Sequence, residues 1–206
     1  MNFHIALSVV RFLLARALAI APPILLAACT TLPDRLTLPA ALVLRQPAAN
    51  FTATGRIAAR DTGDSNRGFS GGFAWTHKSV EDVVELWTPL GQIAARVTMT
   101  VAGAEIEYPD RRRTIAASTE EYLSEAIGVA LPLSALPHWL QAMPLVRVPY
   151  RAETDSKGRL VTLWQNGWQI SYTDYSDETT SAYPTRMRLS QGDIEARMII
   201  TEWTSR

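Results

Sequence analysis

Residues 51–60 read FTATGRIAAR, and small or apolar side chains occupy every second position from Phe51 to Ala59. Residues 69–76, FSGGFAWT, repeat this pattern. Because successive side chains of a strand point to opposite faces of a sheet, a period of two predicts strands with one buried face and one solvated face. One solvated face is typical of antiparallel sheets. The two stretches therefore predict a mainly β protein.

The same alternation returns along much of the remaining chain. It covers residues 93–101, 105–108, 168–172, 187–189 and 194–200. Short segments rich in turn-forming residues lie between the alternating stretches. They are residues 61–66, 109–110, 155–158, 166–167 and 191–192. Such turns are typical of sequential hairpins, so we expect a single curved antiparallel sheet.

The period changes once, between Ser118 and Met143. Ser118 and Glu121 form a capping box, which predicts a first helix that stops at Gly128. A second helix is expected to open near Ser134 and to present an apolar stripe. Helices this short are not stable alone in water, so both should pack on the apolar, concave face of the sheet. Periodicity leaves open whether the space between helices and sheet is filled or hollow.

Residues 26–29, LAAC, contain the single cysteine of the chain and match a bacterial lipobox. Arg11 and Arg16 precede an uncharged apolar run, which is the pattern of a signal peptide. The run is shorter than the roughly 20 apolar residues of a membrane span. We therefore expect a signal peptide over residues 1–28, cleavage before Cys29 and acylation of that residue. The alternative is an ordinary secretory signal with an incidental cysteine.

Attachment through Cys29 would place three acyl chains at the new N-terminus, which gives effectively irreversible anchoring. Thr30 stands where an aspartate holds many bacterial lipoproteins in the inner membrane, so its presence favours the outer membrane. Residues 29–49 contain three prolines and no sustained period, which predicts a lipidated N-terminus and tether. Residues 50–206 then form one domain that faces the periplasm.

Composition and motifs argue against nucleic-acid binding and catalysis. Removal of residues 1–28 takes two arginines and no acid from a chain with 20 basic and 20 acidic residues, leaving a net charge of −2. His77 and His138 belong to no metal or nucleophile motif, so we expect solvated or packing residues, no catalytic residue, no metal site and no cofactor. Arg111–Arg113 follow a Pro-Asp turn and predict either a solvated hairpin edge or a docking patch for an acidic partner.

Several segments of the expected domain, by their order and spacing, resemble the LolB family of outer-membrane lipoproteins. They are FTATGRIAAR (51–60), GGFAWTH (71–77), ELWTPLGQ (85–92), EEYLSEAIGVALPLSALPHWLQAMP (120–144), QNGWQISYTDY (165–175), YPTRMRL (183–189) and a terminal strand ending in Trp203. The resemblance covers nearly the whole domain. It implies an open, incomplete β-barrel with short helices as a lid over an apolar cavity, which agrees with the sheet and helices predicted above.

The resemblance also implies a function. Such a protein would accept triacylated lipoproteins from a LolA-like periplasmic carrier in its cavity and insert them into the inner leaflet of the outer membrane. The implied partners are this carrier, the acyl chains of the cargo and outer-membrane phospholipid, and a monomer without enzymatic activity is expected. The carrier shares the fold but lacks the lipobox, so Cys29 separates the two kinds of protein.

Two sets of site residues follow. The resemblance implies that Leu90, between Pro89 and Gly91, inserts into the membrane; the alternative is an ordinary exposed leucine. The candidates for lining the cavity are the apolar residues that the alternation turns inward. They are Phe73, Trp75, Ile93, Val97, Ile106, Leu136, Leu140, Trp168, Ile170 and Met198.

Cavity size separates the carrier from its alternative. A ligand pocket should enclose at least about 300 Å³. A smaller space would contradict the carrier function and favour a structural or accessory lipoprotein that binds a protein partner and fills its apolar face with its own side chains.

Overall fold

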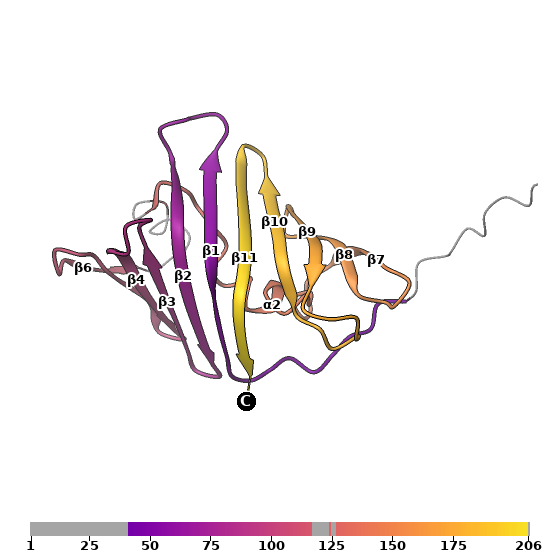
Figure 1. Cartoon of the computed structure of the whole chain (residues 1–206). Helices are drawn as coiled ribbons and strands as arrows, with labels where there is room; N and C mark the ends of the chain where they lie inside the picture. The colour runs from indigo at the N-terminus through magenta and orange to yellow at the C-terminus, as the bar shows by residue number, and fades with distance from the viewer. Residues whose placement is uncertain (1–40, 117–123, 125–126, 206) are drawn as a thin grey trace, which may run out of the picture. The chain divides into compact units, whose positions relative to one another are not determined.

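The computed structural model describes residues 41–116, 124 and 127–205. These residues form one antiparallel sheet of eleven strands, in the order β6-β5-β4-β3-β2-β1-β11-β10-β9-β8-β7 (Figure 1). In chain order the strands are β1 (Phe51–Asp61), β2 (Gly68–Lys78), β3 (Glu81–Trp87), β4 (Ile93–Thr100), β5 (Gly103–Glu107), β6 (Arg113–Ala116), β7 (Tyr150–Thr154), β8 (Leu160–Gln165), β9 (Trp168–Tyr175), β10 (Pro184–Gln191) and β11 (Ile194–Ser205). Because β6 and β7 end the strand order without pairing to each other, the sheet is open. The prediction of a mainly β protein with one open antiparallel sheet is confirmed.

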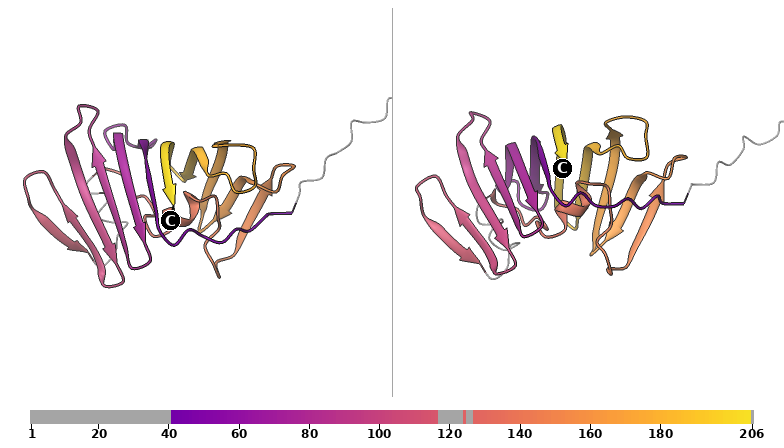
Figure 2. Two further views of the ribbon diagram at one scale, coloured as in Figure 1. Left: turned by 60° about the horizontal axis from the view of Figure 1, so that its bottom comes forward. Right: turned by 90° about the horizontal axis from the view of Figure 1, so that it is seen from below.

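The first and last strands of the chain lie side by side at the centre of the sheet. β1 and β11 pair along their whole length, from Phe51 opposite Ser205 to Asp61 opposite Ile194. From this pair, β2 to β6 follow one another toward one edge, and β10 back to β7 toward the other. The sheet curves so that one face is concave (Figure 2).

Turn chemistry explains the hairpins. Asn166 and Gly167 join β8 to β9, and both have a positive φ, of 52° and 78°. A two-residue hairpin loop with two positive φ angles favours Asn-Gly strongly, because its twist matches that of the strands. The expected hairpin at residues 166–167 is therefore confirmed.

Four strands of the structure were not predicted, because their sequences lack the alternation of apolar and polar residues. They are β3, β6, β7 and β8. In β3 and β8 the strict alternation is broken by adjacent apolar pairs, such as Val83 with Val84 and Leu160 with Val161. A short strand with apolar residues on both faces cannot be identified by a period of two.

Ile93 was predicted to face inward, and this prediction is wrong. Leu86 pairs with Ala95, but Trp87 pairs with Ile93, so Ala94 is an extra residue on β4. Such a bulge reverses the facing of the residues beyond it. Ile93 therefore lies on the outer face and is 50% exposed, whereas Ala95 and Val97 are fully buried.

The concave face is covered by residues 127–145, which we call the covering segment (Figure 1). Its helix α2 (Leu136–Trp139) is four residues long, shorter than the predicted second helix, and Ile127 at the start of the segment is also helical. The capping box of the predicted first helix, Ser118 with Glu121, lies outside the described residues. A helical lid is therefore not confirmed.

Residues 128–135 of the covering segment form bends and turns and no helix, although the preceding Ile127 is helical. The buried side chains of this stretch include Val129, Leu131, Pro132 and Leu133. Pro132 disfavours a helical conformation at the preceding residue, and the Leu133 amide donates to the Leu131 carbonyl at 2.9 Å, which closes a turn. Across the part of the chain that the structure describes, no helix is long and apolar enough to cross a membrane.

Two adjacent glycines in β2 provide a test of how closely β2 approaches β3. A Cβ on Gly71 would lie 1.9 Å from the carbonyl oxygen of Trp87, whereas a Cβ on Gly72 would meet the Trp87 ring at an ordinary 3.4 Å. We expect Gly71→Ala to lower the free energy of unfolding by at least about 2 kcal/mol, because the backbone of β3 must move. Gly72→Ala should change it little. Denaturant unfolding of both variants measures the difference, and equal stabilities would contradict the close approach.

Candidate functional site

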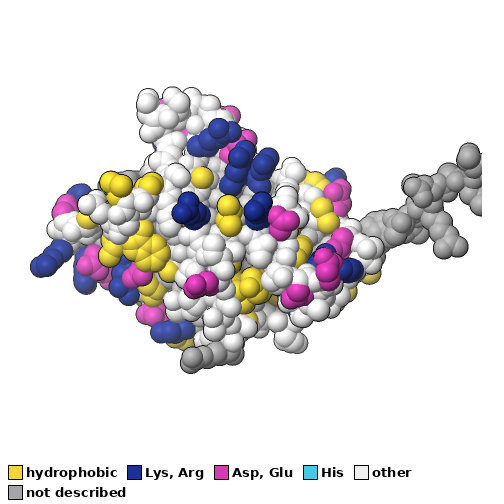
Figure 3. All heavy atoms as spheres, viewed as in Figure 1, with side chains coloured by type: hydrophobic (Ala, Val, Ile, Leu, Met, Phe, Trp, Pro, Cys, Tyr) yellow, Lys and Arg dark blue, Asp and Glu magenta, His cyan; other side chains and the backbone are white. Residues whose placement is uncertain are grey.

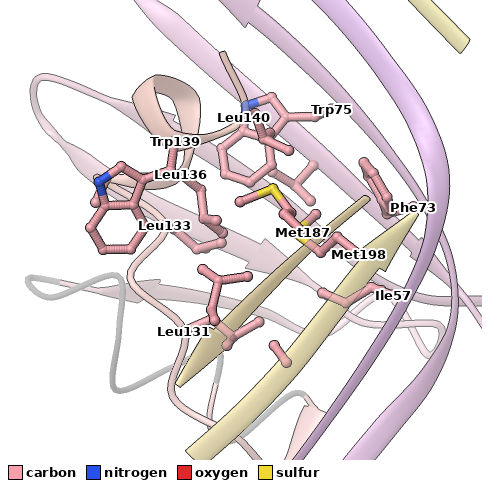
Figure 4. Close-up of a cluster of buried hydrophobic side chains, with 14 of the residues drawn as sticks. Ile57, Phe73, Trp75, Leu131, Leu133, Leu136, Trp139, Leu140, Met187 and Met198 are labelled. Atoms are coloured by element: carbon pink, nitrogen blue, oxygen red, sulfur yellow. The ribbon is translucent and has the colours of Figure 1, made fainter. Parts of the chain in front are cut away.

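The apolar space between the sheet and the covering segment is the candidate site. Side chains from β1, β2, β10 and β11 point toward side chains of the covering segment (Figure 4). Together they enclose a cavity of about 20 Å³. Its walls are Ile57, Phe73, Trp75, Val84, Leu86, Ile127, Leu131, Leu133, Leu136 and Met198.

The cavity is apolar, as expected, but much too small for an acyl chain. A volume of about 20 Å³ is near that of one or two water-sized spheres, against the roughly 300 Å³ of an ordinary ligand pocket. The expectation of a pocket of ligand size is therefore not met. The physical reason is that Leu131, Leu133 and Leu136 fill the concave face that the strands leave open.

Four of the predicted cavity residues line this space: Phe73, Trp75, Leu136 and Met198. Five others are buried in the same core but are not among the cavity walls: Val97, Ile106, Leu140, Trp168 and Ile170. Ile93 is on the other face. The prediction missed Leu131 and Leu133, although the alternation IGVALPL over residues 127–133 carries the signal.

Two methionines lie at the centre of the sheet's concave face. Met187 on β10 is directly opposite Met198 on β11, and both side chains are buried against the covering segment (Figure 4). Methionine is unbranched and polarizable, so it adapts to irregular apolar neighbours. The middle of the space can therefore accept a different apolar partner with little strain.

A buried glutamine holds one end of the covering segment to the sheet. Gln165 on β8 accepts hydrogen bonds at Oε1 from Trp139 Nε1 (3.1 Å) and from the Leu145 amide (2.8 Å). Its Nε2 donates to the carbonyl oxygens of Leu145 and Val148, both at 3.1 Å. Trp139 is held a second time, because Tyr172 donates from its hydroxyl to the Trp139 carbonyl at 3.0 Å. Burial raises the pKa of Tyr172, so this hydroxyl stays protonated.

The described part of the predicted tether is bonded to the domain. We call residues 41–50 the strap. Val43 donates its amide to the Gly158 carbonyl at 3.0 Å, and the Ala48 amide donates to Gln141 Oε1 at 2.7 Å. Arg45 donates to the Gln141 carbonyl and to the carbonyl oxygens at residues 181–182. The strap is therefore bonded to the covering segment at Gln141.

The guanidinium of Arg45 is half-buried, and burial lowers the pKa of this group, partly offset by nearby Tyr175 and Tyr172. An arginine stays charged even so, because its ordinary pKa lies far above neutral pH. Its hydrogen bonds to backbone carbonyls are therefore charge-assisted, which makes them stronger than neutral ones.

The two histidines lie close enough to each other to interact electrostatically. His77 Nδ1 is 2.8 Å from Asp82 Oδ1, and Trp75 Nε1 donates to the same oxygen at 2.6 Å. His138 is on α2, and its pKa is lowered by burial and then by His77, with Asp82 acting in the opposite direction. Among the described residues, no group of three or more metal-ligating side chains is placed to hold an ion.

The β3–β4 loop, residues 88–92, projects an apolar side chain. The Gly91 amide donates to the Thr88 carbonyl at 2.9 Å, and the Thr88 amide to the Gln92 carbonyl at 2.8 Å, which closes a tight turn. Gly91 has a φ of +80°, a conformation that glycine adopts without strain. Leu90 lies at the tip and is 88% exposed.

Two of the three arginines in the run on the β5–β6 hairpin are paired with nearby acids. Arg113 lies 3.1 Å from Glu105 and 3.6 Å from Glu107, and Arg112 lies 2.5 Å from Asp110. Such local pairing favours the solvated hairpin edge over a docking patch for an acidic partner.

Comparison with known proteins gives one consistent result. Residues 49–203 match the family model described as "Outer membrane lipoprotein LolB". The chain is 38% identical over 187 residues to the outer-membrane lipoprotein LolB of Azoarcus sp., which covers 91% of this chain and 93% of that protein. It is 34% identical to the LolB of Cupriavidus taiwanensis over 78% of this chain and 77% of that one. The match thus spans the strap, the sheet and the covering segment.

Gln165 and its exposed neighbour Gln169 provide a test of the contact between sheet and covering segment. We expect Gln165→Leu to lower the free energy of unfolding by about 3 kcal/mol, since several buried polar groups lose their partners. Gln169→Leu, on the solvated face of β9, should have little effect. Urea titration followed by tryptophan fluorescence measures both values. Equal stability of the two variants would show that the Gln165 contacts contribute nothing.

Proposed function

Because the chain belongs to the LolB family of outer-membrane lipoproteins, which serve lipoprotein localisation, we propose a specific role for it within that process. It receives triacylated lipoproteins from a LolA-like periplasmic carrier and inserts them into the inner leaflet of the outer membrane. The acyl chains occupy the space between the concave face and the covering segment. Neither step needs a cofactor or covalent chemistry.

The observation that carries this proposal is the way the covering segment is attached. In the described part of the chain it pairs with no strand of the sheet, and apolar side chains make most of its contact. Its polar attachment consists of the bonds at Gln165, Tyr172, Arg45 and Gln141 and one from Arg67 to the Gly128 carbonyl at 3.0 Å. An acyl chain can replace apolar contacts with apolar contacts, so the segment can be displaced without exposing the concave face to water.

The energetics require a protein at this step. A triacylated cargo carries roughly forty or more methylenes, and at about 0.8 kcal/mol each their exposure costs on the order of 30 kcal/mol. Noncovalent affinity saturates near about 20 kcal/mol, so a protein shields acyl chains less well than a bilayer holds them. Cargo then moves downhill from carrier to receptor to membrane without nucleotide hydrolysis.

Two parts of the chain serve the membrane side of this role. Acylated Cys29 anchors the protein, and Leu90 enters the acyl region during delivery. Burial of one leucine contributes about 1.5 to 3 kcal/mol, which orients an anchored domain but does not hold a free one.

The small cavity favours one alternative, an accessory lipoprotein whose apolar face is permanently filled. The two functions are separated by a transfer assay. The mature chain without its cysteine, residues 30–206, contains every described strand and the whole described core, so it is expected to fold by itself. It is incubated with a LolA-like carrier holding labelled lipoprotein. Movement of label to the domain supports the receptor, and retention on the carrier supports the accessory protein.

Arg45 provides a test of whether the covering segment opens. We expect Arg45→Ala to favour the open state by more than tenfold, because charge-assisted hydrogen bonds contribute about 1.5 to 3 kcal/mol each. Binding of a hydrophobic dye should rise accordingly.

Arg159→Ala is the matched control, because Arg159 also donates to a backbone carbonyl, that of Asp177, but is bonded to no residue of the covering segment. Dye binding that is unchanged in both variants, or raised equally, would contradict opening at the strap.

Leu90 provides a test of delivery. We expect Leu90→Glu to retain folding and cargo uptake but to slow delivery into liposomes at least tenfold, because a charge must approach the acyl region. Val101→Glu, at the fully exposed tip of the β4–β5 turn, is the control and should deliver normally. Uptake is measured by crosslinking and delivery by liposome flotation. Loss of uptake with normal delivery would instead place Leu90 in the carrier-docking surface.

A further inference from the structure

The outer face of the sheet carries a patch of arginines at its centre. We call Arg56 on β1, Arg197 on β11 and Arg188 on β10 the outer arginine patch. All three side chains are exposed, and Arg188 is directly opposite Arg197 in the strand register. Arg56 is opposite Ile199, two residues further along β11 from Arg197. Figure 3 shows basic side chains gathered on this face around an apolar centre.

No ion pair among the described residues neutralises the patch, although Arg197 and Arg188 lie close enough to Glu195 to help Arg60 lower the pKa of that carboxyl. Neighbouring arginines are paired, Arg60 with Glu195 at 2.7 Å and Arg186 with Asp174 at 3.5 Å. For the three patch residues, by contrast, no carboxylate of the described chain lies within ion-pair distance. Like charges directly opposite on neighbouring strands destabilise a sheet, so the stability of the fold does not explain Arg188 beside Arg197. The net charge of the chain without residues 1–28 is −2, so the positive charge of the patch is opposite in sign to that of the chain as a whole.

A groove connects the patch to the loop that carries Leu90. It has a volume of about 540 Å³. Arg56, Arg197 and Ile199 line one side of it, and residues 87–89 with Gly91 line the other. Gly71 and Gly72 of β2 also line it, between the arginines and the loop. A guanidinium, a groove and an exposed leucine thus lie on one face.

We propose that the outer arginine patch and this groove bind the phosphate headgroups of anionic phospholipids at the membrane surface. Guanidinium groups bind phosphate oxygens in a bidentate way, and arginine is the preferred residue for this contact. Headgroups in the groove place Leu90 at the depth of the acyl chains beneath them. The inference rests on the proposed delivery step, and it adds a second, electrostatic contact to that of Leu90.

The position of the patch favours a membrane over an acidic protein. The patch shares its groove with the loop proposed to insert, and both belong to a lipid-anchored family. Cys29 and Ala41, where the described chain begins, are twelve positions apart, a length of chain that spans at most roughly 40 Å. The anchor therefore keeps this face within reach of the bilayer.

The test uses residues 30–206 and sedimentation with vesicles of phosphatidylcholine, alone or mixed with phosphatidylglycerol. The wild-type chain should bind the mixed vesicles more tightly, and high salt should remove the difference. Each arginine near an anionic surface contributes about fivefold in affinity, so the variant with Arg56→Gln, Arg188→Gln and Arg197→Gln should lose about a hundredfold.

The control carries Arg111→Gln, Arg113→Gln and Arg147→Gln, which change the net charge by the same amount at other exposed positions. It should bind the mixed vesicles nearly as well as wild type. Circular dichroism and thermal melts verify that each variant is folded. Wild-type binding by the patch variant, or an equal loss in the control, would overturn the proposal.

A cargo-transfer measurement completes the test. A patch variant that binds vesicles normally but takes cargo slowly from the carrier would assign the patch to an acidic protein, and would overturn the membrane site. A wild-type chain that takes no cargo, yet binds phosphatidylglycerol vesicles through the patch, would refute the proposed receptor function and leave the lipid site intact. Failure of the proposed lipid-binding site is thus distinguished from failure of the proposed receptor function.

Discussion

The pairing of β1 with β11 is the constraint on which the rest of the fold depends. Within the described sheet, the two halves of the strand order meet at this pair and nowhere else. The pair runs along the full length of both strands and includes a bulge at Gly55, where a Cβ would lie 1.9 Å from the Ile199 carbonyl oxygen. Because the outer ends of the order, β6 and β7, remain apart, the sheet curves without closing. The open concave face follows from this arrangement, and so does the need to cover it.

The covering segment is attached to the sheet in a different way from that in which the strands are attached to one another. A strand is held by backbone hydrogen bonds, which have no substitute in an apolar ligand, whereas the covering segment is held by apolar packing and a few polar contacts. A filled interior and a binding function are therefore compatible: Leu131, Leu133 and Leu136 occupy the space that acyl chains would take. The strap connects the covering segment to the part of the chain that leads back to the anchor, since Arg45 and Ala48 both donate hydrogen bonds to Gln141.

The same strand periodicity gives the sheet two surfaces with different tasks. Inward positions of β1, β10 and β11 carry Ile57, Met187 and Met198, which are buried in the core. Outward positions of the same strands carry the outer arginine patch. One face thus suits apolar chains and the other suits phosphate. The groove beside the patch reaches the β3–β4 loop, where Leu90 projects. The fold therefore places an electrostatic contact and an apolar contact within one surface.

Apart from β3, β6, β7 and β8, the sequence by itself determined which strands have a buried and a solvated face, and so the antiparallel class of the sheet. Phe73, Trp75 and Met198 were found by this rule, because side-chain direction in a strand is a local property. The lipobox and the exposed tip at Leu90 are likewise local patterns.

Only the tertiary structure decided the facing of Ile93, the walls and volume of the cavity, and the contacts between residues far apart in the chain. Ile93 faces outward because of a bulge that depends on the pairing of β4 with β3. Leu131 and Leu133 line the cavity because a segment without helical structure at these residues crosses the concave face, and the small volume depends on how both layers pack. Arg45 meets Gln141 across 96 residues, and Arg188 meets Arg197 through strand register. Contacts between distant segments and the space that they leave depend on the relative position of whole elements, which no local period encodes.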